Sequence, residues 1–281
     1  MEAAWQSWIG RSERSVDRVT VAPVAALAAT LDRDDSPPAD GDALPPLWHW
    51  LYFLPHYRAS EVGADGHAKR GGFLPPIPLP RRMWAGGRVT FRAPIRIGES
   101  IARESRIVDV QRKEGRSGPL AFVVVRHAIS NEHGVAIVEE HDIVYRGEPS
   151  ADGGKPHSTP APVGAAWSRE IHPDPMLLFR YSALTFNSHR IHYDRRHATE
   201  VEGYPGLVVH GPLIATLLVD LLRHGLPHAD IGEFSFRAMR PLFDGEPFYV
   251  RGQPAHDRGS VGLWAESMHG ALAMDATARL R

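Results

Sequence analysis

Two series of segments, one in each half of the chain, have the apolar and polar pattern of β-strands. The N-terminal series covers residues 89–93, 101–111, 121–131 and 135–145, and the C-terminal series covers residues 167–171, 231–240, 247–255, 261–266 and 271–280. The β-branched run 123–125 is typical of a central strand. Turn residues such as Lys113-Glu114-Gly115 separate neighbouring segments, which is typical of antiparallel sheets.

Helical patterns are fewer. Residues 1–35 are predicted to be helical, and Asp174 with Pro175 predicts the start of a helix that extends to about Leu184. The longest apolar helical pattern has large side chains at Leu213, Ile214, Leu217, Leu218, Leu221 and Leu222. The aromatic segment 48–54 is predicted to be a buried strand. A curved antiparallel sheet wrapped around a helix is the economical way to bury both kinds of element.

The chain is predicted to divide into two domains. Residues 149–166 are rich in Gly, Pro, Ser and Ala, so they are predicted to be a linker between residues 1–148 and 167–281. Residues 63–80 contain too many Gly and Pro residues for regular structure, and they are long enough to form a functional loop.

Composition excludes several classes of function. With 43% apolar residues the chain can build a sizeable core, and a net charge of −1 gives no reason to expect nucleic acid or an anionic membrane as partner. The chain has no cysteine, which excludes disulfides, thiolate metal sites and cysteine nucleophiles. It has no apolar run of membrane-spanning length and no signal-peptide pattern, so a cytoplasmic location is expected.

One polar segment is not explained by packing. Asn187, His189, Arg190, His192, Tyr193 and Asp194 crowd into eight positions that have neither a helical stripe nor a strand alternation, so they are predicted to form a loop. Tyr204-Pro205-Gly206 and a short apolar run then lead to His210-Gly211-Pro212 and the apolar helix. The unpaired amides at the start of a buried helix suit a developing oxyanion. This order of elements predicts an active site.

The residues from Asn187 to His192 resemble the Asp-x-Asn-Pro-x-His motif of MaoC-like hot-dog hydratases and dehydratases. The histidine matches, whereas Asn187, His189 and Arg190 replace the Asp, Asn and Pro. The wider pattern is similar to the branch that contains 3-hydroxyacyl-thioester dehydratase 2 and the mesaconyl-C4-CoA hydratases. It comprises residues 48–50, 71–76, 81–87, 186–194 and 204–211.

The resemblance implies an α+β fold, a double hot-dog in which each half is a curved antiparallel sheet wrapped around a helix. The N-terminal half would complete the substrate tunnel and the C-terminal half would carry the catalytic residues. The implied reaction is reversible hydration of an enoyl-CoA thioester, or dehydration of its 3-hydroxyacyl form, with no cofactor. A short branched dicarboxylic acyl group is expected, and a homodimer is allowed. The alternatives are an acyl-carrier-protein dehydratase, a non-catalytic acyl-CoA-binding protein and a thioesterase.

Four residues are candidates for catalysis, each with an alternative. His192 would be the general acid and base, or a hydrogen-bonded structural histidine. Asn187 would orient the catalytic water, since an amide cannot exchange protons near neutral pH. Asp194 would be a second catalytic carboxylate or would orient an imidazole, or it would cap a short helix. Gly211 would offer its amide to the thioester oxygen, or would permit tight helix–sheet packing.

A second group of residues is expected to bind substrate. Arg190 would pair with the free carboxylate of the acyl group, or with Asp194. Arg81 and Arg82, beside Trp84, would bind the phosphates or adenine of CoA, or would be solvated. The remaining candidates to shape the site are His189, Tyr193, Tyr204 and His210. A zinc site formed by His189, His192 and His210 is not expected, because the first two would need a helix to share one face.

Overall fold

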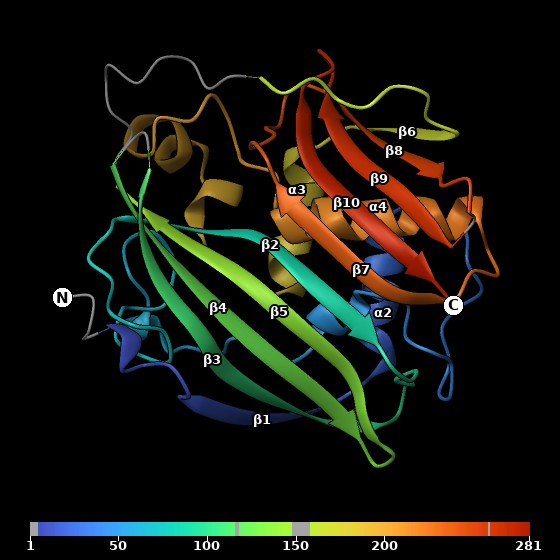
Figure 1. Cartoon of the computed structure of the whole chain (residues 1–281), viewed down its shortest axis with the longest axis horizontal. Coiled ribbons are helices and arrows are strands. Elements are labelled where there is room, and N and C mark those ends of the chain that lie inside the picture. Colours follow the sequence, from blue (N-terminus) through green and yellow to red (C-terminus); the bar gives the residue numbers. More distant parts are fainter. Residues whose placement is uncertain (1–4, 116–117, 148–157, 258) are drawn as a thin grey trace.

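One antiparallel sheet of ten strands runs through both halves of the chain (Figure 1). The structure, a computed structural model, describes residues 5–115, 118–147, 158–257 and 259–281. The sheet order is β1-β3-β4-β5-β2-β7-β10-β9-β8-β6. The strands are β1 (Ser12–Arg18), β2 (Arg81–Phe91), β3 (Ser100–Gly115), β4 (Gly118–Asn131), β5 (Gly134–Arg146), β6 (Trp167–Ile171), β7 (Ile231–Ala238), β8 (Phe248–Pro254), β9 (Ser260–Ser267) and β10 (Leu272–Leu280).

The two halves of the sheet join where β2 pairs with β7. The register runs from Gly86 opposite Arg237 to Thr90 opposite Glu233. A Cβ atom on Gly86 would lie 2.6 Å from the carbonyl oxygen of Phe236, so the close approach of these strands requires a glycine. This pairing makes the sheet continuous across the molecule.

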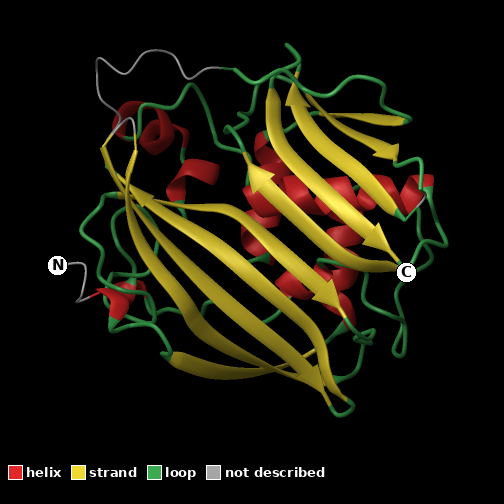
Figure 2. Ribbon diagram, viewed as in Figure 1, coloured by secondary structure: helices red, strands yellow, loops and turns green. Residues whose placement is uncertain are grey.

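Three α-helices lie behind the sheet in the view of Figure 2. They are α2 (Val21–Thr30), α3 (Pro175–Leu184) and α4 (Gly211–Gly225). Helix α4 contacts β6, β8, β9 and β10, and every residue from Leu213 to Leu222 is buried. The predicted start of α3 is confirmed, since the Asp174 carboxylate accepts a 2.7 Å hydrogen bond from the Leu177 amide. No helix within the described ranges is long and apolar enough to cross a membrane.

Two predictions about the N-terminal half were wrong. Residues 12–18 form β1 rather than part of a helix. This strand lies at the sheet edge and buries little of either face, so its sequence shows hardly any apolar alternation. Residues 48–51 form a 3₁₀ turn rather than a strand, preceded by Leu47 at φ 71°. Aromatic residues there indicated burial correctly but not the backbone conformation.

The other predicted strands are present, with different ends. Strand β2 begins at Arg81 rather than at residue 89, because Gly86 and Gly87 obscure its pattern. Of the predicted linker 149–166, residues 149–157 lie outside the described residues. Its remainder runs beside β10, where Pro160 bridges Ala271, and β6 begins at Trp167. The division into two domains at this linker stays a prediction.

Burial of α4 predicts a large cost for truncating its core side chains. Leu218 has no exposed surface, so Leu218→Ala should lower the free energy of unfolding by about 2–5 kcal/mol in urea titrations. Val201, 68% exposed, provides the control, and Val201→Ala should change it by less than about 0.5 kcal/mol. A Leu218→Ala protein as stable as the parent would contradict this assignment of the core.

Candidate active site

The polar loop 187–194 is held against a loop from the N-terminal half. The Arg190 amide donates to the Asp65 carbonyl oxygen at 2.9 Å, and the Ser188 hydroxyl donates to the Gly66 carbonyl oxygen at 2.6 Å. Gly66 has φ +90°, and a Cβ atom there would lie 1.7 Å from the Ser188 carbonyl oxygen, so no other residue fits. Residues from both halves therefore build the site.

His192 is buried and its tautomer is fixed. It lies in the 3₁₀ turn Arg190–His192 with 8% exposure, and Nδ1 is 2.7 Å from the Val208 carbonyl oxygen. Because a carbonyl only accepts, Nδ1 carries the proton and Nε2 presents a lone pair. Burial lowers the pKa of His192 to about 4, although the bond to Val208 opposes the shift. His192 is therefore a neutral base at pH 7.

Three more histidines surround His192. The His210 ring stacks on it with centroids 3.7 Å apart, and the His189 ring meets it edge-on at 5.4 Å. The His67 ring lies 3.8 Å from that of His189. Burial lowers the pKa of all three, and the pKa of His210 lies well below its ordinary value. The surroundings of this row of imidazoles thus disfavour the charged form of each ring.

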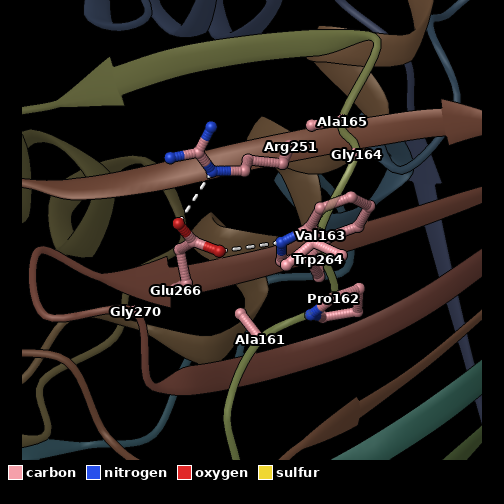
Figure 3. A pocket seen from close by; sticks show the side chains of 9 residues that line it. All are labelled: Ala161, Pro162, Val163, Gly164, Ala165, Arg251, Trp264, Glu266 and Gly270. Atoms are coloured by element: carbon pink, nitrogen blue, oxygen red, sulfur yellow. Dashed lines mark hydrogen bonds and ion pairs between the residues drawn. The ribbon is translucent and has the colours of Figure 1, made fainter.

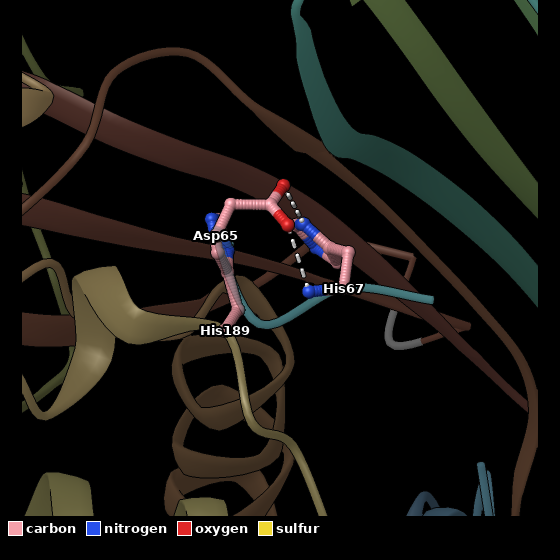
Figure 4. A group of neighbouring side chains, drawn as sticks. All are labelled: Asp65, His67 and His189. Atoms are coloured by element: carbon pink, nitrogen blue, oxygen red, sulfur yellow. Dashed lines mark hydrogen bonds and ion pairs between the residues drawn. The ribbon is translucent and has the colours of Figure 1, made fainter. Parts of the chain in front are cut away.

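Asp65 and His67 were not predicted from the sequence. The Asp65 carboxylate lies 3.0 Å from His67 Nδ1 and accepts the His67 amide at 3.0 Å, beside His189 (Figure 4). One ligand atom from each of these three residues lies within 4.8 Å of the others, so they could hold a metal ion. The predicted length of the loop 63–80 was the only signal in the sequence that pointed to this segment.

Asn187 begins the polar loop and Gly211 begins helix α4. The Asn187 side-chain oxygen accepts the His189 amide at 3.0 Å, which leaves its NH₂ group as the donor available to a ligand. Gly211 is the first residue of α4, and a Cβ atom on it would meet no atom of the described residues within 4 Å. Tight packing is therefore not the reason for a glycine at this position.

Asp194, Arg190 and Tyr193 hold the loop in shape. The Asp194 carboxylate accepts the His197 amide at 3.0 Å and Arg190 Nη2 at 2.7 Å. Arg190 Nη1 donates to the Ala64 carbonyl oxygen at 3.0 Å, and the Tyr193 hydroxyl donates to that of Ser188 at 3.0 Å. Asp194 thus makes the capping contact that was the alternative to a catalytic role. Arg190 makes the ion pair with Asp194 that was the alternative to binding the substrate.

A cavity of about 440 Å³ extends from this loop over the N-terminal half of the sheet. Asn187 and Pro212 line one part of it, and Arg82 and Trp84 on β2 line another. Arg81 is directed elsewhere, because consecutive strand residues face opposite sides. Its guanidinium lies 3.6 Å from the Glu202 carboxylate and over the Tyr204 ring. Of the predicted site residues, Asn187, Arg82 and Trp84 line the cavity. The described residues that line it do not include Arg81, His189, Arg190, His192, Tyr193, Asp194, Tyr204, His210 or Gly211.

A polar cluster at the cavity wall was also missed by the sequence analysis. Glu139 has 2% exposure and accepts Trp50 Nε1 at 2.9 Å, with His49 Nε2 at 3.1 Å and His141 Nε2 at 3.3 Å. Burial favours a raised pKa, but His141 and His49 outweigh it and hold the pKa of Glu139 well below its usual range. Glu139 and His141 with His127 form a second group that could hold a metal ion.

A second cavity, of about 370 Å³, lies between residues 161–165 and the strands β8 and β9 (Figure 3). Its charged groups are already paired, since Arg251 Nε and Trp264 Nε1 donate to Glu266 at 2.8 and 2.9 Å. None of the residues that line this second cavity belongs to the loop 187–194.

Solved structures with the same fold include a MaoC-like dehydratase and a protein described as a double hotdog. The crystal structure of a MaoC-like dehydratase from Phytophthora capsici is similar over 100% of this chain and 98% of that chain, with a TM-score of 0.72 and 14% identity. A Mycobacterium tuberculosis protein described as a double hotdog fold gives a TM-score of 0.60 at 14% identity, over 97% and 96% of the two chains. The predicted α+β double hot-dog is confirmed.

The family model of hydroxyacyl-thioester dehydratase type 2 matches residues 47–244, and the chain belongs to this family. A mesaconyl-C(4)-CoA hydratase of Chloroflexus aurantiacus is 51% identical over 99% of this chain and 98% of its own length. A mitochondrial hydroxyacyl-thioester dehydratase type 2 of Schizosaccharomyces pombe is 27% identical over 83% and 87%. The prediction of a hydro-lyase of the hydratase and dehydratase class is thereby confirmed.

The neutral histidines predict a loss of stability in mild acid. His127, His192 and His210 are at most 8% exposed, and burial lowers the pKa of each below 6.5, that of His127 to about 3. Unfolding releases them to bind protons below pH ~6.5, so the unfolded state is favoured as pH falls. Each should contribute about 1 kcal/mol of lost stability between pH ~7.5 and ~5.5, measured by urea unfolding.

The variant His192→Gln, which has no titrating group at this position, should reduce that pH-dependent loss by about 1 kcal/mol. Equal unfolding free energies of the parent protein at the two pH values would show that these histidines are protonated in the folded state.

Proposed function

We propose that this enzyme reversibly hydrates a short branched dicarboxylic enoyl-CoA thioester such as mesaconyl-C4-CoA. The observation that carries the proposal is His192, a buried neutral base with Nε2 unbonded among the described residues, next to the first turn of α4. The substrate class is supported by the 51% identity to the mesaconyl-C(4)-CoA hydratase over nearly the whole chain.

In the hydration direction His192 Nε2 accepts a proton from water as the water oxygen bonds to the β-carbon. The thioester oxygen accepts the Gly211 amide at the start of α4, where the helix dipole and the absence of a side chain favour a developing enolate. The proton on His192 is then delivered to the α-carbon, which completes the addition. The Asn187 NH₂ group donates to the water oxygen and orients it.

One imidazole does the proton transfer in this scheme. Asn187 cannot accept a proton, and the Asp194 carboxylate is taken by the His197 amide and Arg190. The neighbouring rings of His189 and His210 pack His192 in place and exclude water from it. Their role is to hold the base and to keep its charged form unfavourable.

The N-terminal half supplies the cavity walls for the acyl group, and CoA is the carrier in this proposal. A homodimer and a cytoplasmic location belong to the same proposal, on the grounds of the resemblance and the cysteine-free sequence. Loss of the enoyl-thioester absorbance with several acyl-CoAs tests the reaction. Release of free thiol would indicate a thioesterase, binding without turnover would indicate a silent acyl-CoA-binding protein, and turnover of acyl-carrier-protein thioesters alone would indicate the other dehydratase class.

Substitution of His192 should abolish most turnover. His192→Ala and His192→Gln should lower kcat by roughly 10²–10⁴, the usual effect of removing a positioned acid or base. His133, whose side chain is 74% exposed on a turn, is the control, and His133→Gln should retain the parent rate. Because His192 is buried, the melting temperature of each variant is measured alongside. A folded His192→Gln protein with the parent kcat would refute the assignment.

Asn187 and Asp194 should respond differently. Asn187→Ala should lower kcat by on the order of 10²-fold and raise KM less, if its amide acts mainly in the transition state. Asp194→Asn should keep most of the activity, since Asn caps a helix about as well and solvent screens the exposed ion pair with Arg190. Steady-state kinetics on mesaconyl-C4-CoA measures both.

If activity collapsed in Asp194→Asn while the melting temperature stayed the same, Asp194 would be a second catalytic carboxylate. The variant Asn187→Asp keeps the oxygen that accepts the His189 amide but removes the NH₂ donor, so it separates loss of the donor from a change in the shape of the loop.

A further inference from the structure

The main cavity carries an excess of positive charge. Among the described residues that line it, the formally charged ones are Arg82, Arg103 and Glu139, so one arginine has no counterpart. Burying a cation without an anion is costly. The cavity is therefore suited to a ligand that brings one negative charge.

Glu139 is already engaged. Its carboxylate lies within 3.3 Å of Trp50 Nε1, His49 Nε2 and His141 Nε2. The negative charges that act on Arg103 are those of Glu139, Glu13 and Asp17. No carboxylate of the described residues comes within 4.0 Å of the Arg103 guanidinium. Its guanidinium lies 4.9 Å from the Phe53 ring centroid. Both arginines lack a carboxylate within 4.0 Å among the described residues, and Arg82 is the one whose charge reaches the imidazoles beside the loop 187–194.

Arg82 lies near the catalytic loop. It lies directly opposite Tyr145, a neutral neighbour, in the pairing of β2 with β5, and no carboxylate of the described residues lies within 4.0 Å of it. Its charge acts on both His67 and His189, and the His189 ring contacts His192. Arg82 is thus anchored at the cavity wall with guanidinium donors left over.

We propose that Arg82 binds the free carboxylate of the acyl group and so selects dicarboxylic substrates. This inference rests on the proposed hydratase function. In a C4 thioester of mesaconate the free carboxyl group is bonded to the same carbon that water attacks. The cation that meets it must therefore stand beside the catalytic loop, as Arg82 does. Arg190, the candidate from the sequence, already binds Asp194 and the Ala64 carbonyl oxygen.

The test is the ratio of kcat/KM for mesaconyl-C4-CoA to that for crotonyl-CoA, a neutral substrate. Arg82→Met should lower this ratio by about 30- to 1,000-fold, the range for leaving one partner of a desolvated charge pair alone. Arg82→Lys should give an intermediate ratio, since it keeps the charge but not the fork of donors. Arg103→Met and Arg190→Met are the matched controls, and each should leave the ratio within about threefold of the parent value.

Equal losses on both substrates in a folded Arg82→Met protein would overturn the proposal, because they would assign Arg82 to the CoA phosphates or to the fold. A selective loss in Arg103→Met instead would overturn it as well. Measuring the binding of acyl-CoA ligands that are not hydrated distinguishes a failure of this proposal from a failure of the proposed function. Succinyl-CoA and butyryl-CoA differ by the same carboxyl group, and calorimetry should show that Arg82→Met weakens succinyl-CoA alone. If the parent hydrates neither enoyl-CoA but binds succinyl-CoA through Arg82, only the proposed function fails.

Discussion

Burial of α4 on all sides is the constraint from which the site follows. Its ten residues from Leu213 to Leu222 are buried, so the sheet must curve around the helix, and the extended residues Leu207–Val209 before it are buried too. That entry segment directs the Val208 carbonyl oxygen at His192. The same packing that stabilises the fold therefore fixes the tautomer of His192, and the space beside Gly211, where a Cβ atom would stand, is open.

The site also depends on the joining of the two halves. The Gly66 loop accepts hydrogen bonds from the Ser188 hydroxyl and the Arg190 amide. The buried Asp220 of α4 pairs with Arg33, which follows α2, and with Arg169 on β6. A charge buried to this degree is tolerated only with such partners. Residues of the N-terminal half thus hold both the loop 187–194 and helix α4, and they also form most of the cavity wall.

The sequence predicted what depends on local pattern. The long strands, the cap of α3 and the buried α4 follow from periodicity and from residues such as Asp174 and Pro175, and the hydratase-like loop followed from its unusual polar content. Asp65, His67 and Glu139 could not be found in this way, because each joins the site through contacts between distant segments. Edge strand β1 was missed for a different reason, since it buries too little to alternate.

Charge accounts for the departure of this loop from the broader motif. If the substrate carries a carboxylate on the reacting carbon, an aspartate at position 187 would place a second negative charge beside it. At ~5 Å and an effective dielectric constant of ~20, that repulsion would be about 3 kcal/mol. Asn187 avoids it while still accepting the His189 amide, and burial keeps the imidazoles of His189 and His192 neutral. In the proposed mechanism the proton transfer then falls to one histidine, and recognition of the anion falls to an arginine on β2.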